Sequence, residues 1–427
     1  MANGEGKGNP VLSEYVRLPR AVHVLCVGML INRAGAFFTI FLTIYLSEEL
    51  GFGVPFATFA MGVAGLGAML GAICGGQLAD QIGRRPVMLA AVFGSAVMLL
   101  VLSVISQRLP FLFAIFAFSF INDMYRPAGS AMIGDLVPAD RSQHAFGLMF
   151  ISINLGFAIA PTLGGMLADY SFRWLFWGDA ITTASFGLMI VAFIRETKPQ
   201  IEANQERKPS VHQDTATVVQ AIKYIASDTT FLLFCLATLL NALLMTQGFS
   251  TLPIAMLENG YTKAEFGRII AINGVLIVCA QLPLTSLLSR FDRLTVIASG
   301  ALLIAIGFGS NAFGSSLPFV VMAIIIWTAG EMFKAPFMQA VVLDLAPKQL
   351  RARYQGVFSM CFALSVVLGA PLGGQILNRY GSTVLWKCVF FVGVLSACLY
   401  LLSASAIRLR SNARHETKTK FAEEPAS

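Results

Sequence analysis

Charged residues are scarce in this chain, and their scarcity argues against an ordinary water-soluble domain. Only 12% of the 427 residues are Asp, Glu, Lys or Arg, whereas 56% are hydrophobic and the mean hydropathy is +0.72. Soluble domains usually carry about 25% charged residues. A soluble protein this apolar would expose large hydrophobic patches and aggregate, whereas the same surface can face lipid. The composition therefore indicates an integral membrane protein.

Residues for metal, disulfide and nucleotide chemistry are few or unsuitably spaced. The seven cysteines occur singly in or beside apolar runs, so neither a zinc site nor a disulfide framework is indicated. The four histidines form no pair at metal-ligand spacing, and no P-loop lysine is present. We therefore expect no enzyme activity, no metal, no cofactor, and an ion gradient rather than ATP as the energy source. The first residues lack the apolar core and cleavage site of a signal peptide.

Long apolar runs are abundant, and we interpret them as twelve transmembrane helices in an all-α integral membrane fold. A helix needs about 20 apolar residues to cross about 30 Å of hydrocarbon, and each run meets that requirement. The expected spans are 21–47, 54–78, 86–106, 110–134, 144–167, 173–194, 230–251, 267–289, 294–314, 317–341, 354–378 and 384–407.

The distribution of positive charge predicts the orientation. With the N-terminus inside, the cytoplasmic side holds 21 of the 30 Lys and Arg residues and the outer loops hold six. The other three, Arg33, Arg126 and Lys334, lie at membrane depth. This bias predicts that both termini are cytoplasmic. It also accounts for the net charge of +7 without a nucleic-acid partner.

An internal repeat divides the chain into two pseudo-symmetric halves of six spans. The sequence Asp135-Leu136-Val137-Pro138 recurs 209 residues later as Asp344-Leu345-Ala346-Pro347. A polar stretch separates the halves, and within it Thr215 to Ala226 is amphipathic, which is typical of a helix on the membrane surface. The expected organisation is a first half (1–200), a cytoplasmic linker (201–229), a second half (230–410) and a cytoplasmic tail (411–427).

Two motifs resemble those of a known family. They are Gly76-Gln77-Leu78-Ala79-Asp80-Gln81-Ile82-Gly83-Arg84-Arg85-Pro86 and Gly156-Phe157-Ala158-Ile159-Ala160-Pro161-Thr162-Leu163-Gly164-Gly165. They resemble the motif A loop and the antiporter motif of major facilitator transporters, and the resemblance covers nearly the whole chain. It implies the major facilitator fold, a substrate cavity between the halves, and rocker-switch transport by alternating access.

The first motif joins two spans through a short turn. Gly76 and Gly83 allow close approach and a tight turn, and Asp80 can pair with an arginine or cap a neighbouring helix. Arg84 and Arg85 would anchor the loop at anionic headgroups. The resemblance implies a conformational latch, and a plain positive-inside hairpin is the alternative. The corresponding loop of the second half, residues 288–293, lacks the pattern, so one half would carry the latch.

The second motif indicates the direction of transport. Pro161 removes a helical hydrogen bond, and Gly156, Gly164 and Gly165 allow close helix packing. The resemblance implies an exporter that exchanges substrate for protons, although the family pattern has glycine where this chain has Ala160. Ordinary small-residue packing is the alternative, and a copy of the pattern at residues 369–371 favours it.

Charged residues inside the apolar runs are the best functional candidates, because each costs about 2.5–3.5 kcal/mol at mid-membrane. Asp123 and Arg126 are three residues apart, as are Glu331 and Lys334, so each pair shares a helix face. In each pair, the two opposite charges could simply neutralise each other. Alternatively, Asp123 or Glu331 carries a proton, with Arg33, Arg126 and Lys334 as charge partners. The region of Glu331 resembles that of proton-coupled multidrug exporters, but the relay arginine expected early in the fourth span is absent from residues 111–120.

These observations together predict a proton antiporter that exports drugs or small metabolites from the bacterial cell membrane. We expect its partners to be a small-molecule substrate, protons and the lipid bilayer, and we expect it to work as a monomer. A proton symporter that imports a metabolite and a transport-dead membrane sensor remain alternatives. Candidate residues for the substrate cavity are Asn32, Phe37, Asn122, Asn154, Asn241, Gln247 and Asn273.

Overall fold

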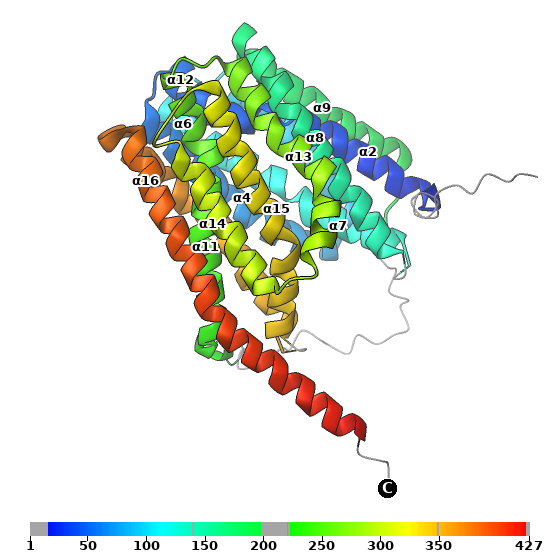
Figure 1. Ribbon diagram of the computed structural model, residues 1–427. Coiled ribbons are helices and arrows are strands. Elements are labelled where there is room, and N and C mark those ends of the chain that lie inside the picture. Colours follow the sequence, from blue (N-terminus) through cyan, green and yellow to red (C-terminus); the bar gives the residue numbers. More distant parts are fainter. Residues whose placement is uncertain (1–15, 139–140, 198–219, 221–222, 348–349, 424–427) are drawn as a thin grey trace, which may run out of the picture. The chain divides into compact units, whose positions relative to one another are not determined.

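The structure is a computed structural model that describes residues 16–138, 141–197, 220, 223–347 and 350–423. The described residues contain helices and no strands (Figure 1). Contacts divide the chain into two compact units, which are described separately below. The first unit takes in residues 1–200 and 256–278, and the second takes in 201–255 and 279–427.

The first unit is a helical bundle in which the first helix, α2, packs between two later helices. The helix α2 packs against α8 and α9, while α4 packs against α6 and α5 against α9 (Figure 1). Its core is built from apolar residues such as Leu25, Met88, Met132 and Phe186. The helices are α2 (Arg20–Ala34), α3 (Phe37–Ile44), the π-helix η1 (Tyr45–Glu49), α4 (Val54–Ile82), α5 (Arg84–Leu102), α6 (Arg108–Asp123), α7 (Tyr125–Leu136), α8 (Ser142–Tyr170) and α9 (Arg173–Phe193).

Two further helices contribute to both units. They are α12 (Leu252–Glu258) and α13 (Lys263–Leu288), and the stretch 256–278 belongs to the first unit. There α13 packs closely on α8, because a Cβ added to Gly274 would lie 2.7 Å from the Cα of Ala158.

The second unit is built from α11 (Thr229–Ser250), α14 (Arg293–Ser310), α15 (Leu317–Leu345) and α16 (Arg351–Glu423). The helix α11 packs along α16, and α14 packs on both α15 and α16. Asp228 begins α11 by accepting a hydrogen bond from the amide of Phe231 at 3.1 Å, and it also accepts one from the hydroxyl of Tyr354 at 2.8 Å. Phe231 and Tyr354 are fully buried, so this cap is part of the core.

Ten helices among the described residues are long and apolar enough to cross a membrane. Ten is two fewer than the twelve expected spans, and each difference has a local cause. The expected fourth span is interrupted at Met124, which leaves α6 and α7 each too short to qualify. The last candidate runs through Gly381, where φ is +80°, and therefore contains two helices joined at a kink. The structure thus confirms the all-helical, multi-span fold.

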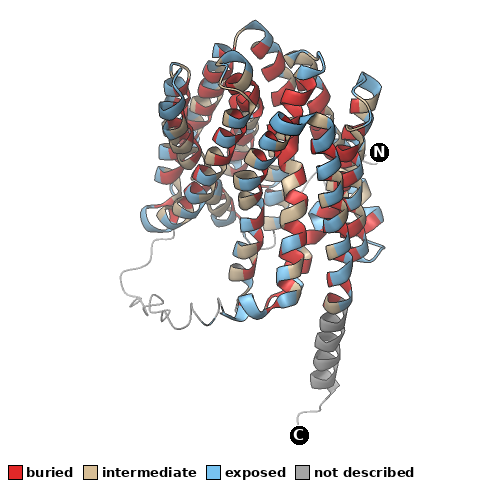
Figure 2. Ribbon diagram, turned by 90° about the vertical axis from the view of Figure 1, so that its left-hand side faces the viewer, coloured by how far each residue is buried: buried red, intermediate tan, exposed pale blue. Residues whose placement is uncertain are grey.

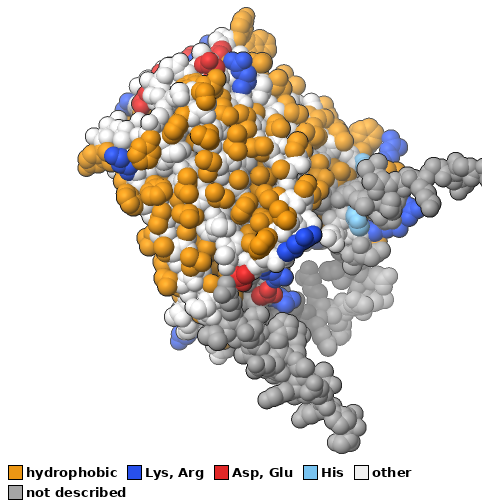
Figure 3. All heavy atoms as spheres, viewed as in Figure 1, with side chains coloured by type: hydrophobic (Ala, Val, Ile, Leu, Met, Phe, Trp, Pro, Cys, Tyr) orange, Lys and Arg blue, Asp and Glu red, His pale blue; other side chains and the backbone are white. Residues whose placement is uncertain are grey.

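The surface of these helices is strongly apolar. Figure 2 shows exposed strips along helices whose other faces are buried, and Figure 3 shows hydrophobic side chains covering the helices in view. Leu188, Leu282, Phe391 and Leu402 are each more than 60% exposed. Apolar exposure on this scale suits contact with lipid rather than water. Most of the amphipathic stretch expected at 215–226 lies outside the described residues.

Candidate functional site

The loop between α4 and α5 turns at a glycine that no other residue replaces easily. Gly83 has φ +112° and ψ 160°, a conformation that is essentially restricted to glycine. A Cβ at this position would lie 2.5 Å from the carboxylate of Glu196. That carboxylate accepts hydrogen bonds from the backbone amides of Arg84 and Arg85, each at 3.0 Å. Glu196, which the sequence analysis missed, therefore caps the positive end of α5.

The first arginine of this loop is held by the protein. Arg84 forms an ion pair with Asp135 at the end of α7, with Nε and Oδ2 3.0 Å apart, and a longer one of 3.4 Å with Asp80. Its side chain is only 12% exposed, whereas that of Asp80 is 75% exposed. The side chain of Arg85 donates a hydrogen bond to the carbonyl of Val191. Within the first unit both arginines bind protein groups, and their anchoring at anionic headgroups stays a prediction.

The second unit contains an equivalent ion pair. Arg293 at the start of α14 pairs with Asp344 near the end of α15, with Nη1 and Oδ2 3.1 Å apart. Both residues lie 209 positions after Arg84 and Asp135. The cap differs, because α14 is capped by the preceding residue, Asp292, through the amide and hydroxyl of Thr295. The motif is lost from the second half, but this ion pair remains.

The first span is broken, and a buried acid lies at the break. The helix α2 ends at Ala34 and α3 begins at Phe37. Asp179 of α9 is 5% exposed and accepts a hydrogen bond from the amide of Phe38 at 3.4 Å. It also accepts one from the hydroxyl of Thr183 at 3.3 Å, and Thr183 in turn accepts one from Asn32 at 2.9 Å. The sequence analysis missed Asp179, although its position inside an apolar run was a usable signal.

Arg33 lies beside this break, and the second motif makes room for it. A Cβ at Gly156 would lie 2.8 Å from the Cβ of Arg33. The guanidinium lies 5.9 Å from the ring centroid of Phe157, within cation–π range. Among the described residues, no group hydrogen-bonds to its Nε. The first unit therefore places a cationic and an anionic side chain around the broken part of its first span.

The remaining residues of the second motif pack helices together. Gly164 lies against the rings of Phe37 and Phe41, and Gly165 lies against the backbone of α13 at Lys263. The carbonyl of Pro161 lies against Gly267 of α13. Pro161 is inside α8, which continues through it to Tyr170. Each of these contacts is close helix packing, which is the alternative interpretation of the motif.

Asp123 and Arg126 meet where the fourth span is interrupted. The Arg126 Nη1 donates to the Asp123 Oδ1 at 3.2 Å, across the junction between α6 and α7. The side chain of Asp123 is 16% exposed and that of Arg126 is 64% exposed on this unit, so the predicted pair forms but its arginine is not enclosed. Asn122, on the same junction, is half-buried.

The second unit buries a lysine in the middle of α15. Lys334 is 5% exposed and donates a hydrogen bond to the side-chain oxygen of Asn241 on α11. Glu331, one turn earlier on α15, is half-buried, and its negative charge acts on Lys334. Asn241 is fully buried, and no described group hydrogen-bonds to its side-chain nitrogen.

The other cavity candidates have structural contacts. Gln247 donates to the carbonyl of Gly369 and accepts from Thr251, which fastens α11 to α16. Phe37 is buried beside Gly164, and Asn154 donates to a carbonyl of its own helix. Asn273 is 3% exposed. Among the described residues, no group of three His, Cys, Asp or Glu could hold a metal ion.

Comparison with known proteins identifies the family. The family model of the Major Facilitator Superfamily matches residues 25–254 and 234–427. The chain belongs to the Major Facilitator Superfamily. It is therefore a multi-pass membrane transporter rather than an enzyme, as the two motifs predicted.

Superfamily members of several kinds resemble the chain along most of its length. An uncharacterized MFS-type transporter, YttB of Bacillus subtilis, is 26% identical over 92% of this chain and 97% of its own. A Na(+), Li(+), K(+)/H(+) antiporter of Planococcus maritimus is 24% identical over 84% of this chain and 90% of its own. The class C tetracycline resistance protein of Escherichia coli is 23% identical over 78% and 82%.

The fold is shared with solved transporters. A crystal structure of a POT family transporter in complex with a thioalcohol-conjugated peptide has a TM-score of 0.76 and covers 92% of this chain and 99% of its own. Because its sequence is 19% identical, this likeness concerns the fold alone.

Proposed function

We propose that this transporter is a proton-coupled antiporter that exports drugs or small metabolites by alternating access. The cation/proton antiporter and the tetracycline resistance protein among its relatives support this direction and coupling. In this proposal the halves at 1–200 and 230–410 alternate, both termini lie in the cytoplasm of a bacterial cell, and a monomer suffices. The motif loop at Gly76, Asp80, Gly83, Arg84 and Arg85 acts as the latch.

The buried contact of Asp179 with the break in the first span is the observation that carries the proposal. An ionised carboxylate accepts a hydrogen bond from the Phe38 amide more strongly than a neutral carboxyl does. Binding a proton at Asp179 would therefore loosen the start of α3 and its link through Thr183 to Asn32. A change of protonation at this acid has a direct structural consequence for the first span.

Asp123 and Glu331 remain proposed coupling acids, each with a cationic neighbour. Neutralising Asp123 would release Arg126, and neutralising Glu331 would remove a negative charge that acts on buried Lys334. Arg33 would stabilise ionised Asp179 in the same way, because its charge reaches that carboxylate. One acid of the second half and two of the first could thus respond to the proton gradient.

Dye efflux from energised bacteria that lack their own exporters tests the proposal. Wild type is compared with Asp179→Asn, Asp123→Asn and Glu331→Gln, with and without a protonophore. We expect protonophore-sensitive efflux that at least one of these substitutions abolishes at normal membrane expression. Glu48→Gln, which neutralises an exposed acid of η1, is the control and should transport normally.

Other outcomes would redirect the proposal. Accumulation of substrate under an inward proton gradient would establish a symporter instead. Full transport by all three variants would remove these acids from the coupling scheme. A well-expressed wild type that moves none of a broad panel of dyes and metabolites, yet retains a protein partner, would favour a sensor.

A further inference from the structure

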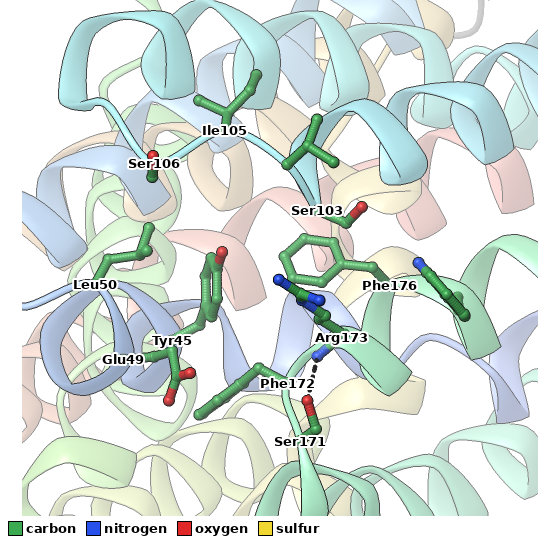
Figure 4. Close-up of a pocket in the computed structure, with 12 residues that line it drawn as sticks. Tyr45, Glu49, Leu50, Ser103, Ile105, Ser106, Ser171, Phe172, Arg173 and Phe176 are labelled. Atoms are coloured by element: carbon green, nitrogen blue, oxygen red, sulfur yellow. Dashed lines mark hydrogen bonds between the residues drawn. The ribbon is translucent and has the colours of Figure 1, made fainter.

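The first unit has a pocket at one end of its helices that the transport proposal does not use. Its volume is about 490 Å³. Three segments enclose it: the π-helix η1, the turn after α5 around Ser103 and Ser106, and the start of α9 at Arg173 (Figure 4). All of them belong to the first unit.

The wall of this pocket contains a tyrosine whose hydroxyl has no hydrogen bond to a described residue. The ring of Tyr45 is 6% exposed and is clamped by Phe172 and Phe176, with ring centroids 5.3 Å and 5.0 Å away. Figure 4 shows its hydroxyl pointing into the open centre of the pocket. Among the described residues, no group hydrogen-bonds to this hydroxyl, which is open to the space of the pocket. A clamped, unpartnered hydroxyl is well placed to bind a ligand.

Two opposite charges accompany Tyr45. Arg173 extends its guanidinium towards the same open centre, while Glu49 lies at its edge, one helical turn from Tyr45 (Figure 4). The fields of both groups act on the phenol, yet they form no ion pair with each other or with another described residue. Both side chains are exposed, so pairing with each other would stabilise them little, and both are free to contact a ligand that carries both signs.

The pocket lies at the ends of the helices, and this position indicates a ligand from the boundary between membrane and water. Trp174 and Trp177, near the start of α9, are 44% and 47% exposed and pack edge to face. Exposed tryptophans at helix ends are typical of the boundary between membrane and water. Val104 in the pocket wall is 79% exposed, so the opening is partly apolar. A lipid headgroup meets both conditions.

We propose that this pocket binds a phosphoethanolamine group, with its phosphate on Arg173 and Tyr45 and its ammonium on Glu49. The guanidinium and the phenol both donate hydrogen bonds to phosphate oxygens, and the carboxylate accepts from a primary ammonium. A choline headgroup lacks the N–H donors, and a glycerol headgroup lacks the cation. The site discriminates among phospholipids by their headgroups.

Lipid retention by the full-length protein tests the assignment. The purified chain in detergent is incubated with equal amounts of phosphatidylethanolamine, phosphatidylcholine and phosphatidylglycerol, repurified, and its retained lipids are counted by mass spectrometry. We expect phosphatidylethanolamine to be enriched about tenfold over the other two, a ratio set by the hydrogen bonds to charged groups that they cannot reproduce. Equal retention of the three lipids would overturn the proposal.

Matched variants locate the site. Glu49→Gln should abolish the preference for ethanolamine over glycerol headgroups. Arg173→Gln should lower the retention of all three lipids. Tyr45→Phe should lower the retention of all three lipids several-fold. The controls Glu48→Gln and Arg108→Gln change an adjacent acid and a neighbouring arginine outside the pocket wall, and should behave as wild type. Wild-type retention in folded Glu49→Gln and Arg173→Gln, or equal losses in the controls, would overturn the proposal.

A competition arm separates a membrane lipid from a soluble ligand. Glycerophosphoethanolamine carries the same headgroup without acyl chains. If it displaces the retained lipid at micromolar concentration, and loses this ability with Arg173→Gln, the site recognises a soluble phosphoethanolamine compound. If it fails to compete while the lipid preference persists, the occupant is a lipid of the bilayer.

Discussion

Replacing Gly83 by alanine tests the account of the loop between α4 and α5. The φ of +112° and ψ of 160° at Gly83 put an alanine under backbone strain of about 1–3 kcal/mol. The new Cβ would also lie 2.5 Å from the carboxylate of Glu196 and push it from the amides of Arg84 and Arg85. Hydrogen bonds to a charged group contribute about 1.5–3 kcal/mol each, but this carboxylate is exposed and can turn to water. The combined cost should be about 2–4 kcal/mol, confined to the start of α5.

Hydrogen exchange of the Arg84 and Arg85 amides, measured by mass spectrometry on purified protein, reports this opening directly. Gly83→Ala should speed exchange there at least about tenfold, because each 1.4 kcal/mol changes an opening equilibrium about tenfold. Gly76→Ala is the matched control in the same motif. Its Cβ would meet only Pro127, at an ordinary 3.8 Å, and alanine favours a helix, so exchange should stay at the wild-type rate. Equal exchange in Gly83→Ala and wild type would refute the reasoning.

Three further outcomes follow from the contacts. Arg84→Gln should lower the thermal unfolding midpoint of the purified protein more than Arg293→Gln, because the Arg84 side chain is 12% exposed and that of Arg293 is 56% exposed; equal losses would contradict this. Asn241→Leu should destabilise the protein by about 1–3 kcal/mol by removing the acceptor of buried Lys334, and adding Lys334→Met should recover much of the loss; strictly additive effects in this double-mutant cycle would deny the coupling. Partial burial and the neighbouring Glu48 raise the pKa of Glu258 above 4.5, so the folded state holds this proton more tightly. Its stabilising contribution is present below pH 4.5 and is lost as the pH rises through the raised pKa, so Glu258→Gln should flatten that part of a melting-temperature profile, and an unchanged slope would exclude the effect.

The sequence predicted the membrane fold well because the length of each apolar run determines whether it can span a bilayer. Each span needs about 20 apolar residues whatever its packing, so the runs could be recognised without contacts. The interruptions were harder to predict. The break at residues 35–36 includes Gly35, but the acid that contacts it, Asp179, is 141 residues from the Phe38 amide that it binds.

The charged sites were only partly predictable. The pair of Asp123 and Arg126 followed from i, i+3 spacing, since that spacing places two side chains on one helix face. The contact of Lys334 with Asn241 joins two residues that are 93 positions apart on different helices, and no local pattern encodes it. Gln247 looked like a cavity residue because it is polar in an apolar run. Its hydrogen bonds with Gly369 on α16 and with Thr251 at the end of α11 show that a polar side chain in an apolar run can join two segments of the fold instead of lining a cavity.

The cap on α5 also sets where the polypeptide could be divided. Glu196 follows the sixth expected span, which contains α9, yet its carboxylate binds the amides at the start of the third span. Thr197 adds a bond from its hydroxyl to Asp135. A gene split before residue 196 would leave the N-terminal fragment without this carboxylate, whereas one split after residue 197 would keep it. For co-expression of two fragments, the first must therefore extend a few residues beyond its last transmembrane helix.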